Sequence, residues 1–166
     1  MHLPARVLAS LLLAAALPAR AFDAGGVGIG AGEEAIRKAF PSAHCKPLEW
    51  KADAADRRCD DARAQVGGIP ARLTFYLKAG AVQAFDLRFD SKDLERLKAQ
   101  LRSRWGEPKA EATETLARRE GEDRKVFKMR WEQGRDTALL VSQLDKKRVS
   151  VEVARGSFFD EIYKVK

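Results

Sequence analysis

The segment 69–108 constrains the fold most strongly, because it combines two half-buried strands with an amphipathic helix. In residues 71–78, apolar side chains alternate with polar ones, a period of two that is typical of a strand with one buried face. Ala79 and Gly80 then supply a turn, since glycine readily adopts the positive φ that tight hairpins need. The return run ends with Phe85, Leu87 and Phe89, which again alternate with polar residues. The pattern predicts an antiparallel β-hairpin.

A helix is predicted directly after this hairpin. Asp90 and Ser91 favour helix N-caps, and Gly106 and Pro108 are residues that end helices. Between them, apolar residues recur at steps of three, four and four, and so they form one stripe on a helix: Leu94, Leu97, Leu101 and Trp105. We expect this stripe to belong to the core.

The N-terminal residues 1–21 have the composition of a cleaved secretory signal peptide. Arg6 precedes an apolar run, and the triplet Ala19-Arg20-Ala21 is typical of a cleavage site. The run covers 11 residues, from 7 to 17, whereas a membrane-spanning helix needs about 20. A lipid anchor would need a cysteine just after the run, but the first cysteine is Cys45. We therefore predict cleavage after Ala21 and no transmembrane segment in the mature chain.

The predicted mature chain, residues 22–166, keeps 145 of the 166 residues, a size typical of one domain. Cleavage removes Arg6 and Arg20 and no acidic residue, so the formal charge falls from +7 to +5. We expect a periplasmic protein, with secretion as the alternative. Its modest basic excess suits another envelope protein or an anionic envelope component as partner. The predicted export and the acidic residues interleaved with the basic ones argue against nucleic acid as a partner.

Residues 22–32 are rich in glycine, and residues 26–31 match the G-x-G-x-x-A pattern of dinucleotide-binding sites. The pattern lacks its context, because no strand precedes it in the mature chain and no βαβ unit follows. No cofactor is therefore predicted. We expect Val27 and Ile29 to form a short edge strand, followed by a helix over residues 33–40 that ends at Pro41.

Cys45 and Cys59 are the only cysteines, an even number in a chain with an export signal. They are predicted to form a disulfide around a charged segment that has few large apolar residues. Closing a loop of about 15 residues stabilises a fold by roughly 3 kcal/mol. A redox pair or a metal site would be expected to show C-x-x-C spacing or further cysteine and histidine ligands, and the sequence has neither.

Few residues are suited to catalysis. His44 is the only histidine of the predicted mature chain, whereas serine and cysteine nucleophiles usually need a histidine base and zinc sites need several ligands. Carboxylates are abundant, so a hydrolase with two catalytic carboxylates is an alternative. Such an enzyme would need a concave pocket that gathers at least two of Asp53, Asp56, Asp60, Asp61 and His44. No catalytic or metal-binding residue is otherwise predicted.

The C-terminal third is predicted to form three antiparallel strands after an exposed linker. Residues 109–123 carry mixed charges and only one sizeable apolar residue, Leu116, which indicates the linker. Three runs then alternate apolar and polar side chains and are separated by turn residues, namely 125–131, 137–144 and 149–154. Residues 157–166 are too apolar for a free tail. We expect them to dock on the core or to bind a partner.

Laid end to end, the predicted elements form two tandem αβββ-like units, the first of which includes a short strand over 62–66. Their strands would merge into one antiparallel sheet with both helices packed on one face, an α+β fold. Two features underlie a resemblance to known protein families. They are the Gly-led helix at residues 30–40 and the helix that ends in residues 105–108 (WGEP), each followed by strands. In architecture the chain resembles the small outer-membrane assembly lipoproteins of the SmpA/OmlA type and the β-lactamase-inhibitor-like proteins. The resemblance implies binding or envelope assembly, although the lipidated cysteine of the lipoproteins is lacking.

We therefore expect a non-catalytic binding or envelope-assembly module. Its contact surface would be an exposed aromatic patch, for which the candidates are Trp50, Tyr76, Phe158, Phe159 and Tyr163. Tyr76 lies on the strand face opposite Phe75, so a second layer such as the C-terminal segment could cover it instead. The alternatives are an inhibitor of an envelope or secreted hydrolase and a carboxylate-dependent hydrolase.

Overall fold

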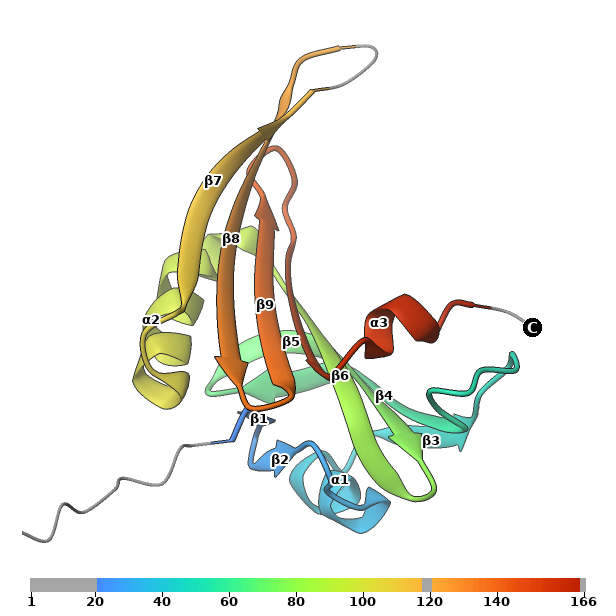
Figure 1. Cartoon of the computed structure of the whole chain (residues 1–166). Coiled ribbons are helices and arrows are strands. Elements are labelled where there is room, and N and C mark those ends of the chain that lie inside the picture. The colour runs from blue at the N-terminus through green and yellow to red at the C-terminus, as the bar shows by residue number, and fades with distance from the viewer. Residues whose placement is uncertain (1–20, 118–120, 165–166) are drawn as a thin grey trace, which may run out of the picture.

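The computed structural model describes residues 21–117 and 121–164. Its main feature is an eight-stranded sheet in the order β3-β4-β5-β6-β10-β9-β8-β7, in which all neighbouring strands are antiparallel (Figure 1). The strands are β3 (His44–Pro47), β4 (Arg57–Val66), β5 (Ile69–Lys78), β6 (Ala81–Phe89), β7 (Ala110–Leu116), β8 (Arg124–Gln133), β9 (Asp136–Gln143) and β10 (Val149–Arg155). The predicted α+β class with an antiparallel sheet is confirmed.

The helices are short, and a small hairpin precedes the sheet. β1 (Asp23–Ala24) pairs with β2 (Val27–Gly28), and the helical elements are α1 (Glu33–Ala39), the 3-10 turn η1 (Ser91–Asp93), α2 (Leu94–Trp105) and α3 (Phe158–Glu161). α1 precedes the strands β3 to β6, and α2 precedes β7 to β10. Since four strands follow each helix, the predicted tandem units with three strands each are not confirmed. The two sets of four strands join where β6 pairs with β10.

Two strands of the eight-stranded sheet have no counterpart among the predicted elements, and both lie at its edges. Residues 110–116 of the exposed linker predicted over 109–123 in fact form β7, which pairs with β8 from Ala110 opposite Arg130 to Leu116 opposite Arg124. All of its side chains are exposed, so no period of two marks a buried face. β3 contains Cys45, at the start of the segment that the disulfide closes, and is only four residues long. Both edge strands are defined by backbone hydrogen bonds to one neighbouring strand. Such bonds do not show in the alternation of side chains from which strands are predicted.

The hairpin and the helix predicted from residues 69–108 are both present, as β5, β6 and α2. Ala79 and Gly80 form the turn with φ of 49° and 80°. The Asp56 carboxylate fixes this turn from outside the hairpin, because its Oδ2 accepts a hydrogen bond from the Ala79 N–H at 2.9 Å. The predicted stripe on α2 is buried at Leu97, Leu101 and Trp105.

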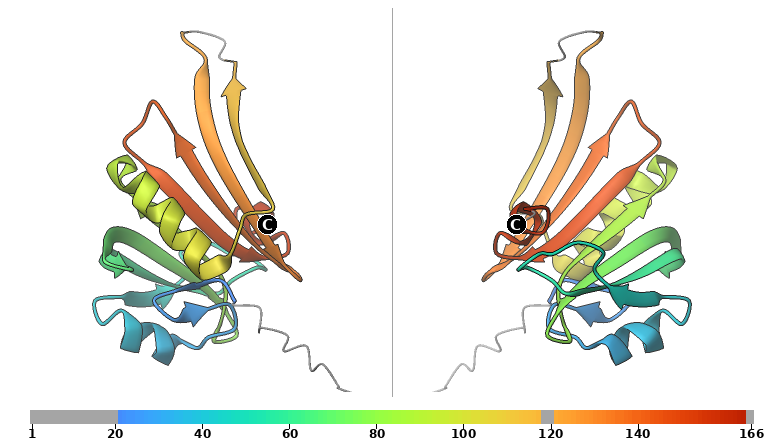
Figure 2. Two further views of the ribbon diagram at one scale, coloured as in Figure 1. Left: turned by 90° about the vertical axis from the view of Figure 1, so that its left-hand side faces the viewer. Right: turned by 90° about the vertical axis from the view of Figure 1, so that its right-hand side faces the viewer.

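One face of the sheet packs against α1 and α2 and forms the larger core. Phe75, Phe85 and Leu87 lie in it and are at most 1% exposed, and Ile36 of α1 and Leu97 of α2 belong to the same cluster. Figure 2 shows α2 on this face and α3 on the opposite one. Apolar residues from both halves of the chain therefore meet in one continuous core.

The opposite face carries a smaller core, formed by the C-terminal segment and the loop between β3 and β4. The buried members of this cluster are Ala55, Tyr76, Ala84, Ala154, Phe158 and Ile162. Trp50, in the loop, donates its Nε1–H to the carbonyl oxygen of Ile162 at 2.9 Å and so joins the two covering segments. The predicted docking of the C-terminal segment is confirmed for its described part, and the segment covers Tyr76.

Cys45 and Cys59 lie opposite each other on β3 and β4 and form the predicted disulfide. The bond ties the short edge strand β3 to the sheet. Residues 1–20 of the predicted signal peptide lie outside the described residues. In the part of the chain that the structure describes, no helix has the length and apolar character needed to cross a membrane.

Candidate functional site

The sheet face opposite α1 and α2, here called the open face, is only partly covered. Directly opposed residues of paired strands point to the same side, so the side chains on this face form rows that cross the strands. From the covered side outward, three successive rows on β5, β6 and β10 are Tyr76-Ala84-Ala154, Thr74-Asp86-Glu152 and Arg72-Arg88-Ser150. The first row belongs to the smaller core beneath α3. The cover provided by α3 therefore ends at the row that contains the carboxyl groups of Asp86 and Glu152, here called the carboxyl row. In the next row, here called the arginine row, Arg72 and Arg88 are exposed to solvent.

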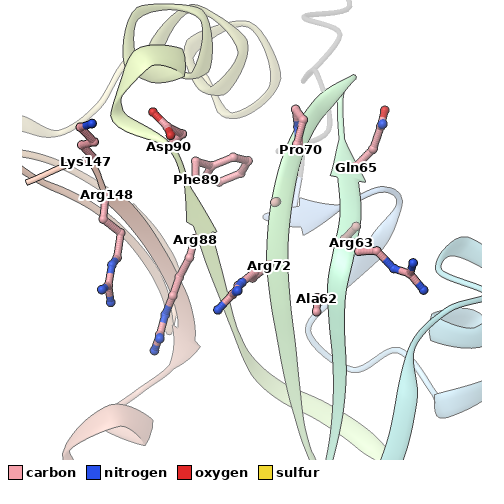
Figure 3. A pocket seen from close by; sticks show the side chains of 12 residues that line it. Ala62, Arg63, Gln65, Pro70, Arg72, Arg88, Phe89, Asp90, Lys147 and Arg148 are labelled. Carbon is pink, nitrogen blue, oxygen red and sulfur yellow. The ribbon is translucent and has the colours of Figure 1, made fainter.

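A groove of about 640 Å³ follows the arginine row. Arg72, Arg88, Lys147 and Arg148 line it, and we call it the basic groove. Figure 3 shows the side chains of Arg72, Arg88 and Arg148 extending toward one region, whereas Arg63 points away from it. Arg148 lies just before β10, two residues from Ser150, so the alternation of the strand places it on the same face as Arg88. The fold therefore gathers three guanidinium groups, from β5, from β6 and from the residue just before β10.

The charges in the basic groove are balanced only in part by the protein itself, because Asp90 is the one carboxylate among its lining residues. Arg72 and Arg88 are directly opposed on β5 and β6, and like charges in that position destabilise a sheet. Arg88 donates its Nε–H to Asp86 Oδ2 at 3.1 Å. Among the described residues, no carboxylate forms an ion pair with Arg72 or Arg148. Planar guanidinium donors that face solvent in this way are suited to bidentate binding of a phosphate or carboxylate.

Asp86 and Glu152 form a second unusual pair, because two carboxyl groups are directly opposed on β6 and β10. Burial raises the pKa of Asp86, against the opposing effect of Arg88 and Arg148. Burial also raises the pKa of Glu152, and the negative charge of Asp86 adds to that rise. Asp86 is 9% exposed, and within the described residues its Oδ1 has no hydrogen-bond partner. An unpaired buried acceptor costs about 1–3 kcal/mol, which a ligand that donates a hydrogen bond would recover.

A second hollow of about 370 Å³ adjoins the basic groove and shares Ala62, Arg72 and Arg88 with it. We call it the aromatic pocket, because Trp50, Tyr76 and Tyr163 line it together with Thr74 and Asp86. The two hollows are therefore parts of one continuous concave surface on the open face.

The aromatic residues of this pocket differ in their freedom to contact a ligand. Tyr163 is 62% exposed and stacks one ring face on Trp50, with the ring centroids 6.3 Å apart and the planes at 19°. Trp50 is also covered by Arg58, whose guanidinium carbon lies 5.8 Å from the ring centroid. Tyr76 is buried, and burial together with its hydrogen bond to Tyr163 raises the pKa of its hydroxyl. The accessible aromatic surface is therefore that of Tyr163.

The five predicted contact residues thus cluster around α3 but do not form one exposed patch. Tyr76 and Phe158 are buried in the smaller core, and Phe159 packs against both of their rings. Trp50 is half-buried between Tyr163 and Arg58. Most of the predicted aromatic set therefore holds the C-terminal segment in place, and Tyr163 alone combines large exposure with a position in the pocket.

Two of the five residues proposed for a hydrolase do share a concave site. Asp60 and Asp61 both line the aromatic pocket. Asp60 Oδ1 accepts a hydrogen bond from Thr74 Oγ1 at 2.8 Å, and its Oδ2 lies 2.9 Å from Arg58 Nε. Asp61 is 3% exposed and accepts hydrogen bonds from the Ser42 hydroxyl and the Arg63 N–H. Both carboxylates are thus engaged by protein groups.

The other three candidates lie elsewhere. Asp53 and Asp56 line a separate hollow in the loop between β3 and β4, and Asp56 holds the hairpin turn. His44 is exposed at the start of the edge strand β3. They share no site with the carboxyl groups of the aromatic pocket.

One group of potential metal ligands occurs among the described residues, made up of Glu33, Cys45 and Cys59. The two sulfur atoms are joined in the disulfide and cannot act as thiolate ligands. Glu33 in turn accepts hydrogen bonds from Arg37 and Arg57, and the Arg37 contact chiefly holds its pKa below the ordinary value. In the oxidised protein these residues therefore do not make a metal site.

The residues that best define the site were not singled out from the sequence. Arg72 and Arg88 alternate with apolar residues around a predicted turn, which is a signal that could have placed them on the same face of adjacent strands. Arg148 and Glu152 reach them only because β10 pairs with β6, more than fifty residues earlier in the chain. Local periodicity carries no information about such pairing.

Comparisons of the chain with protein-family models, with curated protein sequences and with solved structures each gave no match. The geometry of the open face is therefore the basis for a functional proposal.

Proposed function

We propose that the protein is an exported, non-catalytic binding module that recognises an anionic envelope component through the basic groove. The observation that carries this proposal is the convergence of Arg72, Arg88 and Arg148, two of which have no carboxylate partner among the described residues. A sheet that served only its own stability would not place like charges opposite each other. An anion bound between the arginines would attract each guanidinium group and so offset their mutual repulsion.

The arrangement of helices and strands supports a binding role. Each of α1 and α2 is followed by four strands, and the two sets merge into one sheet with an open face. This order is close to the tandem arrangement on which the resemblance to SmpA/OmlA-type and β-lactamase-inhibitor-like proteins rests. Binding or assembly, rather than catalysis, is what that resemblance implies. The disulfide between Cys45 and Cys59 supports an oxidising, extracytoplasmic location.

A carboxylate-dependent hydrolase is the second candidate, because Asp60, Asp61 and Asp86 line one pocket. Of these, Asp86 alone has a buried carboxylate oxygen without a hydrogen-bond partner among the described residues. Glycosidase chemistry needs two carboxyl groups that both reach the scissile bond. Hydrolysis of a chromogenic glycoside that is lost in an Asp86→Asn variant would favour this candidate over simple binding.

The proposal is tested by isothermal titration of the purified, oxidised protein with sodium tripolyphosphate, a compact polyanion. The variant Arg72→Gln/Arg88→Gln/Arg148→Gln is expected to bind at least about tenfold more weakly, since it lacks the guanidinium donors of the groove. The matched control Lys38→Gln/Arg96→Gln/Lys125→Gln removes the same charge from exposed positions outside the groove. It should retain the affinity of the unmodified protein.

Two results would contradict the proposal. Equal weakening in both triple variants would show that only the net charge matters. Absence of binding by the unmodified protein at low salt would show that the groove does not hold anions.

A further inference from the structure

The basic groove and the aromatic pocket offer a ligand two different kinds of contact within one concave surface. The groove presents guanidinium donors from Arg72, Arg88 and Arg148. The pocket presents an exposed tyrosine ring and a buried carboxyl oxygen that lacks a partner among the described residues, Asp86 Oδ1. Arg88 lines both hollows and donates a hydrogen bond to Asp86, so the two kinds of contact are adjacent.

We infer that this surface binds a saccharide that carries a phosphate group, with the phosphate on Arg72, Arg88 and Arg148 and the sugar ring in the aromatic pocket. The inference rests on the proposed anion-binding function and narrows the anion to one chemical class.

The chemistry of the pocket suits a sugar ring better than an acidic peptide. A sugar hydroxyl is both a donor and an acceptor, so it can pair with Asp86 in either protonation state. One face of a pyranose ring is apolar and can lie on the exposed face of Tyr163, while the edge of the ring meets polar groups. An acidic side chain in this position would bring a further negative charge next to Asp60 and Asp86.

The phosphate part of the ligand is suited to the spacing of the arginines. Directly opposed residues on antiparallel strands have Cβ atoms about 4.5–5.5 Å apart, and diagonal neighbours are about 7–8 Å apart. Arg72 and Arg88 are directly opposed, and Arg148 is diagonal to Arg88 across the pairing of β6 with β10. Three long side chains at this spacing can converge on the three terminal oxygens of a phosphate monoester.

Isothermal titration of the purified, oxidised protein with four probes tests the inference: mannose 6-phosphate, inorganic phosphate, uridine monophosphate and hexaglutamate. We expect mannose 6-phosphate to bind about tenfold more tightly than inorganic phosphate, because the sugar adds hydrogen bonds and ring contact. A disaccharide with the same terminal phosphate then distinguishes a glycan, which should bind more tightly still, from a free sugar phosphate, which should bind equally well.

Two variants locate the sugar contact. Asp86→Asn and Tyr163→Ala should each remove the advantage of mannose 6-phosphate over inorganic phosphate. Tyr163→Ala should also leave the binding of inorganic phosphate itself unchanged, because Asp86, and not Tyr163, holds Arg88. Tyr163 is exposed, so its replacement keeps the test valid even where Asp86→Asn disturbs the fold. The matched control Glu34→Gln alters an exposed carboxyl group on α1, outside both the basic groove and the aromatic pocket, and should preserve the advantage.

Three outcomes would overturn the inference and leave the proposed function standing. They are equal affinity for mannose 6-phosphate and inorganic phosphate, tighter binding of uridine monophosphate, and binding of hexaglutamate alone. Failure of all four probes would overturn both the inference and the proposed function.

Discussion

The face of the sheet that packs on α1 and α2 buries large apolar side chains from both halves of the chain, whereas the buried apolar side chains of the opposite face cluster beneath α3 and the loop between β3 and β4. Beyond α3, the row of side chains that contains Asp86 and Glu152 is followed, two residues further along the strands, by the row that contains Arg72 and Arg88. The first face explains why the chain folds. The second face carries two arginines, Arg72 and Arg148, that form no ion pair with a carboxylate among the described residues, and this difference supports the open face as the binding surface that we propose.

The largest expected effect comes from the core face. Leu97 is 1% exposed on α2, so Leu97→Ala should lower the free energy of unfolding by about 2–5 kcal/mol. The matched change Leu139→Ala, at a half-buried position on the open face, should cost clearly less. Urea denaturation of both variants measures the two losses. Equal losses would show that the two faces contribute alike to stability.

The next effect concerns the disulfide that ties β3 to the sheet. Replacing both cysteines, in Cys45→Ala/Cys59→Ala, should lower the free energy of unfolding by about 3 kcal/mol, because the unfolded chain regains the freedom of a closed loop. Chemical denaturation under oxidising conditions measures the loss. Addition of a reductant should destabilise the unmodified protein by a similar amount and leave the double variant unchanged. An intact mass that showed free thiols in the unmodified protein would refute the bond itself.

A pH-dependent effect should distinguish the carboxyl row from the acids near α1. The pKa of Asp86 is higher in the folded protein, so folding binds its proton more tightly, and stability is lost as pH rises from the ordinary value of about 3.9 through the raised one. Asp86→Asn should therefore reduce the stability loss between pH 4 and pH 7, measured as the shift of the thermal midpoint.

Glu33 provides the control of opposite sign. Its pKa is lowered chiefly by the hydrogen bond from Arg37, so its contribution is present above the ordinary value and is lost as pH falls. Glu33→Gln should reduce the loss of stability at acid pH. The same pH profile for both variants would contradict the contrast between the two regions.

The smallest effect is expected in the arginine row. Arg72→Gln removes one of two opposed like charges and should raise the free energy of unfolding by about 0.2–1 kcal/mol at low salt. The gain should shrink at high salt, because exposed charges are screened. Arg96→Gln, an exposed change on α2, should show no such gain. Destabilisation by Arg72→Gln would mean that the arginine row contributes to folding after all.

The sequence predicted the elements whose side chains are half-buried. The hairpin, the helix ending at Trp105 and the strands of the last third all show regular apolar periods, and each is present. β7 was predicted as a linker because its exposed Ala, Glu and Thr residues show no such period. Its strand exists through pairing with β8, a tertiary effect that overrides the local pattern.

The candidate site was less predictable than the fold. Tyr163 and Asp60 were recognised as possible site residues, and both line the aromatic pocket. Arg148 and Glu152 could not be assigned, because a pairing between distant strands brings them beside Arg88 and Asp86. Burial of Asp86 likewise depends on segments far away in the chain, and only the folded structure shows it.

The most direct test of the central claim is a ¹H–¹⁵N chemical-shift titration of the isotopically labelled protein with sodium tripolyphosphate. We predict that the largest changes fall on the amides of Arg72, Arg88 and Ser150 and their neighbours on the open face, and that α1 and α2 change little. Changes centred on the helices, or spread evenly over the exposed lysines and arginines, would contradict the assignment of the open face as the binding surface.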